Sequence, residues 1–337
     1  MRHFSKITTA SVTVLILNSW VVANAAKRST SDPVTTQAEG APVLWREPVD
    51  IASRNLYYGP GGATHVPSGS FTFEQEDMNG SNPKFDVADQ DSVEWRVKLG
   101  EEARPEVVAS RLIWAVGYFA NEDYFMPVLH VQNMLRLKRG QNLVSPDGTV
   151  HNVRLKRHLK GHKKIGMWSW ADNPFTNTRE LYGLRVLMAV INNWDLKDSN
   201  NSIYQTRGDH PEQQYVVSDL GSSFGSAGLN WFEKGNLEDY SRSKLIAKRS
   251  PEFIDFNVPS APRVNVFINV AETVRRLKLC WLGHHIPVAD VRWIASLLAQ
   301  LSPEQIRDAF RAANYSPGQV ETYSRVLEQR IAALGQL

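Results

Sequence analysis

The sequence contains almost no cysteine, and this scarcity excludes several kinds of stabilising site. Cys280 is the only cysteine in 337 residues, so no intramolecular disulfide can form, and no spacing of residues predicts a zinc site. The chain also lacks an excess of charge of one sign. Its 38 Lys and Arg residues stand against 35 Asp and Glu residues, and a net charge of +3 is too small to predict a partner by itself. We find no internal repeat.

A long uninterrupted apolar run is absent as well. Residues 7–22 are mostly apolar but contain Thr, Ser and Asn, so they are a weak candidate for a permanent membrane span. Arg2 and Lys6 precede this run, and Ala23-Asn24-Ala25 fits the small-residue cleavage pattern of a secretory signal peptide. We therefore expect residues 1–25 to be a signal peptide and residues 26–41 a disordered polar leader. The mature protein would be exported, to the periplasm or the medium.

The rest of the chain divides by its periodicity into two parts. Its length and its 42% hydrophobic residues fit two domains, or one domain of two lobes. Alternating residues predict strands at 70–74, 84–87 and 94–99, and the last two are expected to pair as a hairpin. Helical spacing dominates later, beginning with a helix that Thr178 caps and that ends at Asn192-Asn193. Further helices are expected at 271–282, 288–300, 303–313 and 317–334.

Polar residues suited to phosphate chemistry lie between residues 187 and 221. Asp195 and Asn200 stand five positions apart after the Thr178 helix, and a short apolar run then leads to Asp219. Phosphoryl transfer needs a carboxylate to orient the attacking hydroxyl. It also needs an amide oxygen and a second carboxylate to hold Mg²⁺. These three side chains supply that set from two loops.

The same residues resemble a known family. Asp195-Leu196-Lys197-Asp198-Ser199-Asn200 resembles the Asp-x-x-x-x-Asn catalytic loop of the protein-kinase-like superfamily, and Asp219-Leu220-Gly221 resembles its Asp-Phe-Gly metal motif, with Leu in place of Phe. Asn193-Trp194 replaces the usual His-Arg, which points towards divergent branches such as the HipA-like and lipid-kinase-like kinases. The resemblance implies an α+β, two-lobed fold. Residues 42–170 would form an antiparallel-sheet N-lobe with one helix, and residues 171–337 a mainly helical C-lobe.

The resemblance also implies a role for a lysine in the third predicted strand. Lys98 lies between Val97 and Leu99, where it must face solvent or meet an anionic partner, because burying a lone charge is costly. In kinase-like folds a strand lysine holds the α- and β-phosphates and pairs with a glutamate on the next helix. Glu106 fits that partner, and Glu102 is the fallback. The alternatives are a solvent-facing Lys98 and a Glu106 that merely complements the helix dipole.

Gly59, Gly61 and Gly62 form a glycine cluster that a kinase-like fold would use over the nucleotide. Backbone amides of such a loop can approach phosphate oxygens closely. The cluster lacks the usual glycine spacing, so an ordinary turn is the competing interpretation.

The implied reaction moves the γ-phosphate of ATP to a hydroxyl group with Mg²⁺, or Mn²⁺, as cofactor. Lys98 would hold phosphates with help from Glu106, and Asn200 and Asp219 would bind metal. Asp195 would orient the acceptor, and Lys197 would neutralise charge on the transferred group. The acceptor is not identified, and a protein, a lipid, a sugar and a small molecule all remain open. A kinase-like module that binds without catalysis is the alternative. A hydrolase using Asp195 and Asp219 accounts for neither Lys98 nor Asn200.

Residues 135–164 are rich in Lys and Arg and contain Asp147 as their only acid. A strong turn signal at Ser145–Gly148 predicts a hairpin with a basic face inserted in the N-lobe. Such a face would meet an acidic substrate or an anionic surface, or be simply solvated. Little aromatic interleaving accompanies these charges, so nucleic-acid binding is not expected.

Overall fold

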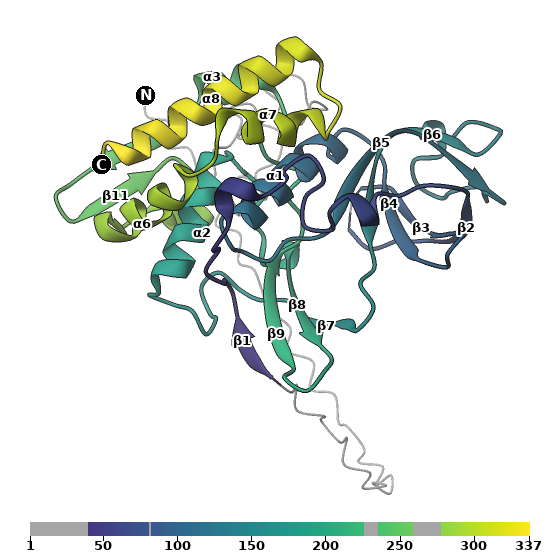
Figure 1. Ribbon diagram of the computed structural model, residues 1–337, viewed down its shortest axis with the longest axis horizontal. Coiled ribbons are helices and arrows are strands. Elements are labelled where there is room, and N and C mark those ends of the chain that lie inside the picture. Colours follow the sequence, from purple (N-terminus) through teal and green to yellow (C-terminus); the bar gives the residue numbers. More distant parts are fainter. Residues whose placement is uncertain (1–39, 81, 226–234, 259–277) are drawn as a thin grey trace, which may run out of the picture. The chain divides into compact units, whose positions relative to one another are not determined.

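A small β-barrel and a larger helical assembly make up the described part of the chain (Figure 1). The computed structural model describes residues 40–80, 82–225, 235–258 and 278–337. The predicted signal peptide and nearly all of the predicted leader lie outside these ranges, as does most of the helix predicted at 271–282. Residues 38–337 form a single compact unit. No helix in the described ranges has both the length and the hydrophobicity of a membrane span.

Five strands close into the barrel, where the sequence predicts an antiparallel sheet. Neighbouring strands are antiparallel except β2 and β5, whose short parallel pairing of Phe71 with Val131 completes the closure. Alternate residues such as Phe85, Val87 and Val97 point inward and fill the barrel with apolar side chains. In pairing order, the strands are β2 (Phe71–Glu76), β3 (Lys84–Asp89), β4 (Glu94–Lys98), β6 (Thr149–Arg157) and β5 (Asp123–Gln132).

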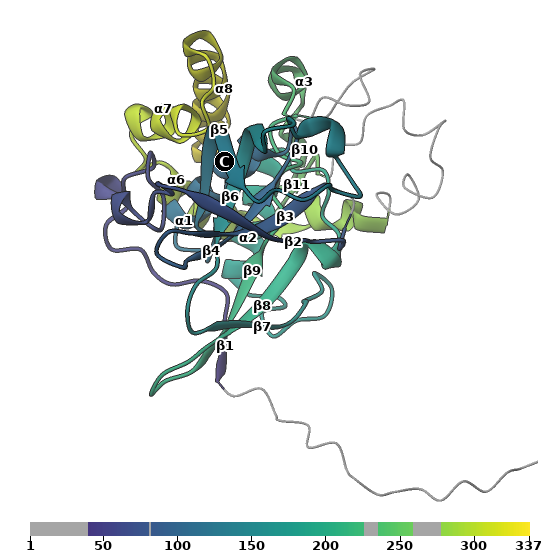
Figure 2. The same ribbon diagram turned by 90° about the vertical axis from the view of Figure 1, so that its right-hand side faces the viewer.

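A second sheet lies beneath the barrel strands in Figure 2. Its β8 and β9 form an antiparallel hairpin, and Asn200 and Asp219 flank the open end of that hairpin. In pairing order, its strands are β1 (Ala41–Val43), β9 (Glu212–Val217), β8 (Asn201–Thr206) and β7 (His162–Gly166).

The basic segment 135–164 is not the inserted hairpin that the sequence predicts. Val153 and Leu155 are fully buried in the barrel, so β6 is engaged between β4 and β5 as a barrel strand. The chain then turns at Gly161, whose positive φ of 81° suits glycine, and β7 pairs with β8 of the second sheet. The basic residues of this segment are thus divided between β6, β7 and the connections beside them.

The helices pack into one large apolar core. Thr178 Oγ1 accepts a hydrogen bond from Leu181 N at 3.2 Å, which confirms the predicted cap of α2, and Ser302 forms a capping box at the start of α7. The helices are α1 (Ala103–Ala115), α2 (Arg179–Val190), α3 (Leu237–Arg242), α6 (Val288–Leu298), α7 (Pro303–Arg311) and α8 (Pro317–Gly335). A third sheet contains β10 (Ile246–Arg249), β11 (Phe253–Phe256) and β12 (Ile286–Pro287).

Helix α1 connects the barrel to the helical core. It contacts β5 and β6 on one side and α7 on the other, and its buried residues Val107, Leu112 and Ile113 belong to the large core. Leu44 and Ile51, which precede the barrel, also belong to that core. A division of the chain at residue 170 therefore stays a prediction, because segments from both sides of it share one core.

Candidate functional site

Lys98 is the centre of a buried charge cluster. Strand alternation places Val97 inside the barrel and turns Lys98 to the other face, where it is only 4% exposed. Its Nζ lies 3.0 Å from Glu106 Oε2, 2.6 Å from Glu102 Oε2 and 2.9 Å from Asp219 Oδ1. Burial alone would lower the pKa of Lys98, but these three carboxylates raise it well above its ordinary value. The lysine is therefore a fixed cation.

Both glutamates expected near Lys98 are present, because α1 starts immediately after β4. Glu106 lies in the first turn of α1, and Glu102 lies at its N-cap position. Each carboxylate has an additional partner: Glu106 Oε1 accepts from Arg154 Nη2 at 2.9 Å, and Glu102 accepts from Asn82 Nδ2. Two carboxylates thus hold the ammonium from the helix side, which restricts its position more than one would.

Arg154 and Asp123 belong to the cluster and are not expected from the sequence as site residues. Arg154 is the register partner of Lys98 on β6, and its Nε lies 3.5 Å from Asp123 Oδ1. Burial raises the pKa of Glu106 and of Asp123, although Arg154 opposes this shift at both groups. A signal was available, because Arg154 lies between Val153 and Leu155 just as Lys98 lies between two apolar residues.

The loop after α2 carries the predicted catalytic residues. Asn193 is fully buried and its Oδ1 accepts a hydrogen bond from Asp195 N at 3.0 Å. Lys197 Nζ lies 2.9 Å from Asp195 Oδ1, so the two predicted catalytic side chains form an ion pair. Asn200 Nδ2 donates to Asp195 O at 2.7 Å, which closes the loop on itself. Asp198, which has no role in the sequence argument, accepts from Trp170 N at 3.1 Å and anchors the loop.

Backbone hydrogen bonds join this loop to the Asp219 loop. Ser218 N and Asp219 N both donate to Asn200 O, at 2.8 and 3.2 Å. Burial alone would raise the pKa of Asp219, but the Lys98 ammonium holds it well below its ordinary range. Gly221 passes close to α1, since a Cβ there would lie 2.5 Å from Glu102 Cβ. The glycine of the Asp-Leu-Gly motif therefore allows the close approach that brings Asp219 to Lys98.

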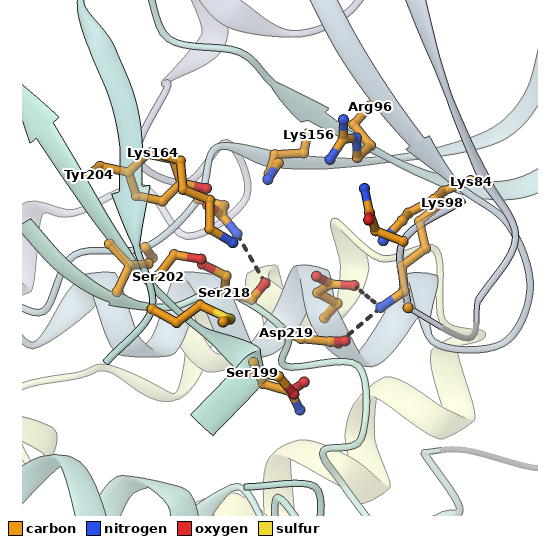
Figure 3. Close-up of a pocket in the computed structure, with 18 of the residues that line it drawn as sticks. Lys84, Arg96, Lys98, Lys156, Lys164, Ser199, Ser202, Tyr204, Ser218 and Asp219 are labelled. Atoms are coloured by element: carbon orange, nitrogen blue, oxygen red, sulfur yellow. Dashed lines mark hydrogen bonds and ion pairs between the residues drawn. The ribbon is translucent and has the colours of Figure 1, made fainter. Parts of the chain in front are cut away.

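The two loops and the Lys98 cluster line one cavity of about 1490 Å³. Strand β4 contributes Lys98, the start of α1 contributes Glu102 and Glu106, and the two loops contribute Asp195, Lys197, Asn200 and Asp219. Figure 3 shows Asp219 and Lys98 approaching each other from opposite sides of this space. The cavity brings together all of the predicted catalytic, metal-binding and lysine-cluster residues.

The predicted phosphate glycines lie elsewhere. Gly59, Gly61 and Gly62 are not among the described residues that line the cavity. A Cβ on Gly61 would lie 2.2 Å from Tyr124 Oη, so close packing accounts for Gly61, and the positive φ of 73° and 64° accounts for Gly59 and Gly62. The turn between β2 and β3 borders the cavity instead. Asp77, Asn79, Gly80 and Asn82 line the cavity from that turn.

Asn200 and Asp219 fit a magnesium ion that is bound together with phosphate oxygens. An amide oxygen and a carboxylate are ligand types that Mg²⁺ accepts, and this ion is usually bound by one or two carboxylates plus substrate phosphates. The Asp219 side chain is 37% exposed, so its oxygens are accessible from the cavity. Within the described ranges, no three His, Cys, Asp or Glu side chains are grouped to hold a metal alone.

Comparison with known proteins gives kinases as structural neighbours. No family model matches the chain, and no curated protein matches it. The proinflammatory kinase CtkA of Helicobacter pylori is similar over 80% of this chain and 98% of its own, at 12% identity and a TM-score of 0.44. The Golgi casein kinase is similar over 80% of this chain and 74% of its own, at 9% identity and a TM-score of 0.37. Because these scores are low, we base the functional assignment on the side chains of the cavity.

Proposed function

We propose that the chain is a protein-kinase-like phosphotransferase that moves the γ-phosphate of ATP to a hydroxyl acceptor. One observation carries the proposal: a buried Lys98, held by Glu106 and Glu102, also contacts Asp219, and all four residues line one cavity together with the Asp195–Asn200 loop. A buried structural ion pair needs only one partner for the lysine. Here an additional carboxylate, Asp219, lies on a separate loop beside the amide of Asn200. Together with Lys98 these groups make up the set that phosphoryl transfer requires.

On the donor side, Lys98 would donate hydrogen bonds to the phosphates. Glu102 and Glu106 are 6% and 1% exposed in their side chains, so they keep the ammonium in place. Asp219 and Asn200 would hold Mg²⁺, which when bound supplies positive charge against the phosphates. In a loose transition state little covalent chemistry is left to the protein, so positioning and charge neutralisation are its main contributions.

On the acceptor side, Asp195 would accept a hydrogen bond from the attacking hydroxyl and take its proton late in the reaction. Its backbone is fixed by Asn193 and Asn200, and its carboxylate, which is paired with Lys197, lines the cavity where an acceptor would bind. Lys197, 2.9 Å from Asp195, lies where it would offset charge on the transferred phosphoryl group. Export of the protein stays a prediction, since it depends on residues outside the described ranges.

Binding of Mg-ATP is the first test. We expect Mg-ATP to raise the melting temperature of the purified chain, because a ligand that binds only the folded state stabilises it by mass action. Asp219→Ala should abolish this shift. Asp209→Ala, an exposed aspartate in the β8–β9 turn, is the matched control and should retain it. No shift with Mg²⁺ or Mn²⁺ in the unmodified chain would contradict the proposal and favour a module that binds without catalysis.

Catalysis needs a separate readout. Asp195→Ala should retain the Mg-ATP shift and lower the rate of γ-phosphate transfer, or of ATP hydrolysis when no acceptor is known, by roughly 10²- to 10⁴-fold. Equal rates in Asp195→Ala and the unmodified chain would remove Asp195 from the chemistry. Nucleotide binding without turnover in the unmodified chain would instead identify a catalytically inactive binding module.

A further inference from the structure

Two lysines of the cavity differ from the other cations that line it. The lining includes eight Lys and Arg residues. Six of them have a carboxylate within ion-pair distance, namely Lys84, Arg96, Lys98, Arg154, Arg157 and Lys197. Lys156 and Lys164 have no such partner in the described part of the chain. Unpaired cations that face one cavity create a positive potential there.

Lys156 and Lys164 converge on one phenol. Lys164 and Tyr204 are register partners on the antiparallel strands β7 and β8, so their side chains lie on the same face. Lys156 comes from β6 of the barrel, lines the same cavity, and lies beside Lys164 and Tyr204 in Figure 3. Burial would raise the pKa of Tyr204, but the two lysines lower it, in agreement with their position near the ring.

Lys164 and Tyr204 lie on a different sheet from Lys98, and Lys156 lies between them and the Lys98 cluster on β6. Figure 3 shows Lys164 and Tyr204 across the cavity from Lys98, with Lys156 between them and with Ser202 and Ser218 beneath Lys164 and Tyr204. The wall thus presents two ammonium groups and several hydroxyl groups. Such a surface favours an anion that accepts several hydrogen bonds over an apolar ring.

We propose that Lys156, Lys164 and Tyr204 form a second anion subsite, and that the acceptor is a small molecule with a phosphate, sulfate or carboxylate group in addition to its reacting hydroxyl. The assignment to the acceptor rests on the proposed phosphotransfer, in which the phosphates of ATP occupy the Lys98 side. An anionic group at the second subsite would orient the acceptor. Its hydroxyl would then point towards Asp195, which lines the same cavity.

Inorganic phosphate is the probe for the subsite. Its binding to the full chain is measured by thermal shift at constant ionic strength and without Mg²⁺. The double variant Lys156→Gln/Lys164→Gln should lose at least about tenfold in phosphate affinity, since hydrogen bonds to charged groups are the strong ones. Tyr204→Phe should lose a smaller factor. Lys163→Gln is the matched control, because Lys163 neighbours Lys164 on β7 but does not line the cavity.

The variants separate a specific site from general effects of phosphate on folded proteins, which act on all variants alike. Phosphate affinity that is unchanged in the double variant, or equally reduced in Lys163→Gln, would overturn the subsite. Lys98→Met should lose the Mg-ATP shift and keep the phosphate shift. If instead the unmodified chain binds phosphate through Lys156 and Lys164 but never binds Mg-ATP, the subsite stands and the phosphotransferase assignment fails.

A competition experiment shows whether the anion subsite belongs to the ATP site or to the acceptor site. Phosphate affinity that is unchanged in saturating Mg-ATP supports an acceptor subsite, because both ligands then fit the cavity together. Mutually exclusive binding of phosphate and Mg-ATP would show that the nucleotide occupies this subsite, and would overturn the assignment to the acceptor.

Discussion

Replacement of Lys98 by methionine should destabilise the fold through a known physical cost. The side chain is 5% exposed, and three carboxylates lie within 3.0 Å of its Nζ. Methionine preserves the apolar stem and removes the charge, so Glu102, Glu106 and Asp219 are left around an uncharged centre. Removing one partner of a buried ion pair typically costs about 3–5 kcal/mol of unfolding free energy. Arg154 still neutralises Glu106, so we expect the lower end, about 3 kcal/mol.

Urea unfolding measures this loss, and a double-mutant cycle identifies its source. Lys98→Met and Glu106→Gln should be less destabilising together than the sum of the single variants, by about 0.5–3 kcal/mol, because the second change removes one of the carboxylates that lost the lysine as a partner in the first. Lys163→Met, on an exposed position of β7, should stay within about 0.5 kcal/mol of the unmodified chain. A loss below about 1 kcal/mol in Lys98→Met, or simple additivity in the cycle, would refute the view that this cluster is held by Lys98.

Three further predictions concern the elements that position the cavity. Burial would raise the pKa of Asp77, but the hydrogen bonds from Asn79 and the charges of Arg96 and Lys84 together lower it; its contribution to stability is therefore present above the ordinary value of 3.8 and lost as pH falls below it. Acid titration of unfolding should accordingly be steeper for the unmodified chain than for Asp77→Asn, and parallel curves would contradict this. Gly221→Ala places a Cβ 2.5 Å from Glu102 Cβ, so it should lower the free energy of unfolding by about 1–3 kcal/mol and abolish the Mg-ATP shift. Full retention of stability and of the shift would show that α1 can move to accommodate the methyl group. Thr178→Ala should cost about 1 kcal/mol by loss of the α2 cap, while Thr178→Ser should not.

The parts of the site that could be predicted are those fixed by local order along the chain. Lys98 and Glu106 are separated only by a tight turn, so a strand followed at once by a helix brings them together whatever the rest of the fold does. Asn200 and Asp219 flank a hairpin, which has the same effect. The pairing of Lys98 with Glu106 is present in the structure, whereas the roles of all four residues stay predictions.

The parts that could not be predicted depend on pairing between distant strands. Closure of the barrel rests on two residue pairs between β2 and β5, a contact too short to leave a sequence pattern. Arg154 enters the site only because β6 pairs with β4 in the register that places it beside Lys98. The position of Gly59 outside the cavity could not be predicted for a related reason. Glycine marks close packing or a positive φ wherever it occurs, and the sequence does not say which neighbour approaches.

The three carboxylates around Lys98 differ in exposure, and this difference indicates how the site would accommodate phosphates. Glu102 and Glu106 are buried and have further partners in Asn82 and Arg154, so these contacts hold both side chains in place. Asp219 is 37% exposed and lies at the end of a loop. Lys98 can therefore exchange Asp219 for a phosphate oxygen while both glutamates continue to hold it. An ammonium with one glutamate would lose half of its support in that exchange, whereas here it keeps two carboxylates of three. The second glutamate thus gives the lysine a fixed position both before and after the ligand arrives, which is the preorganisation that transfer of a charged group demands.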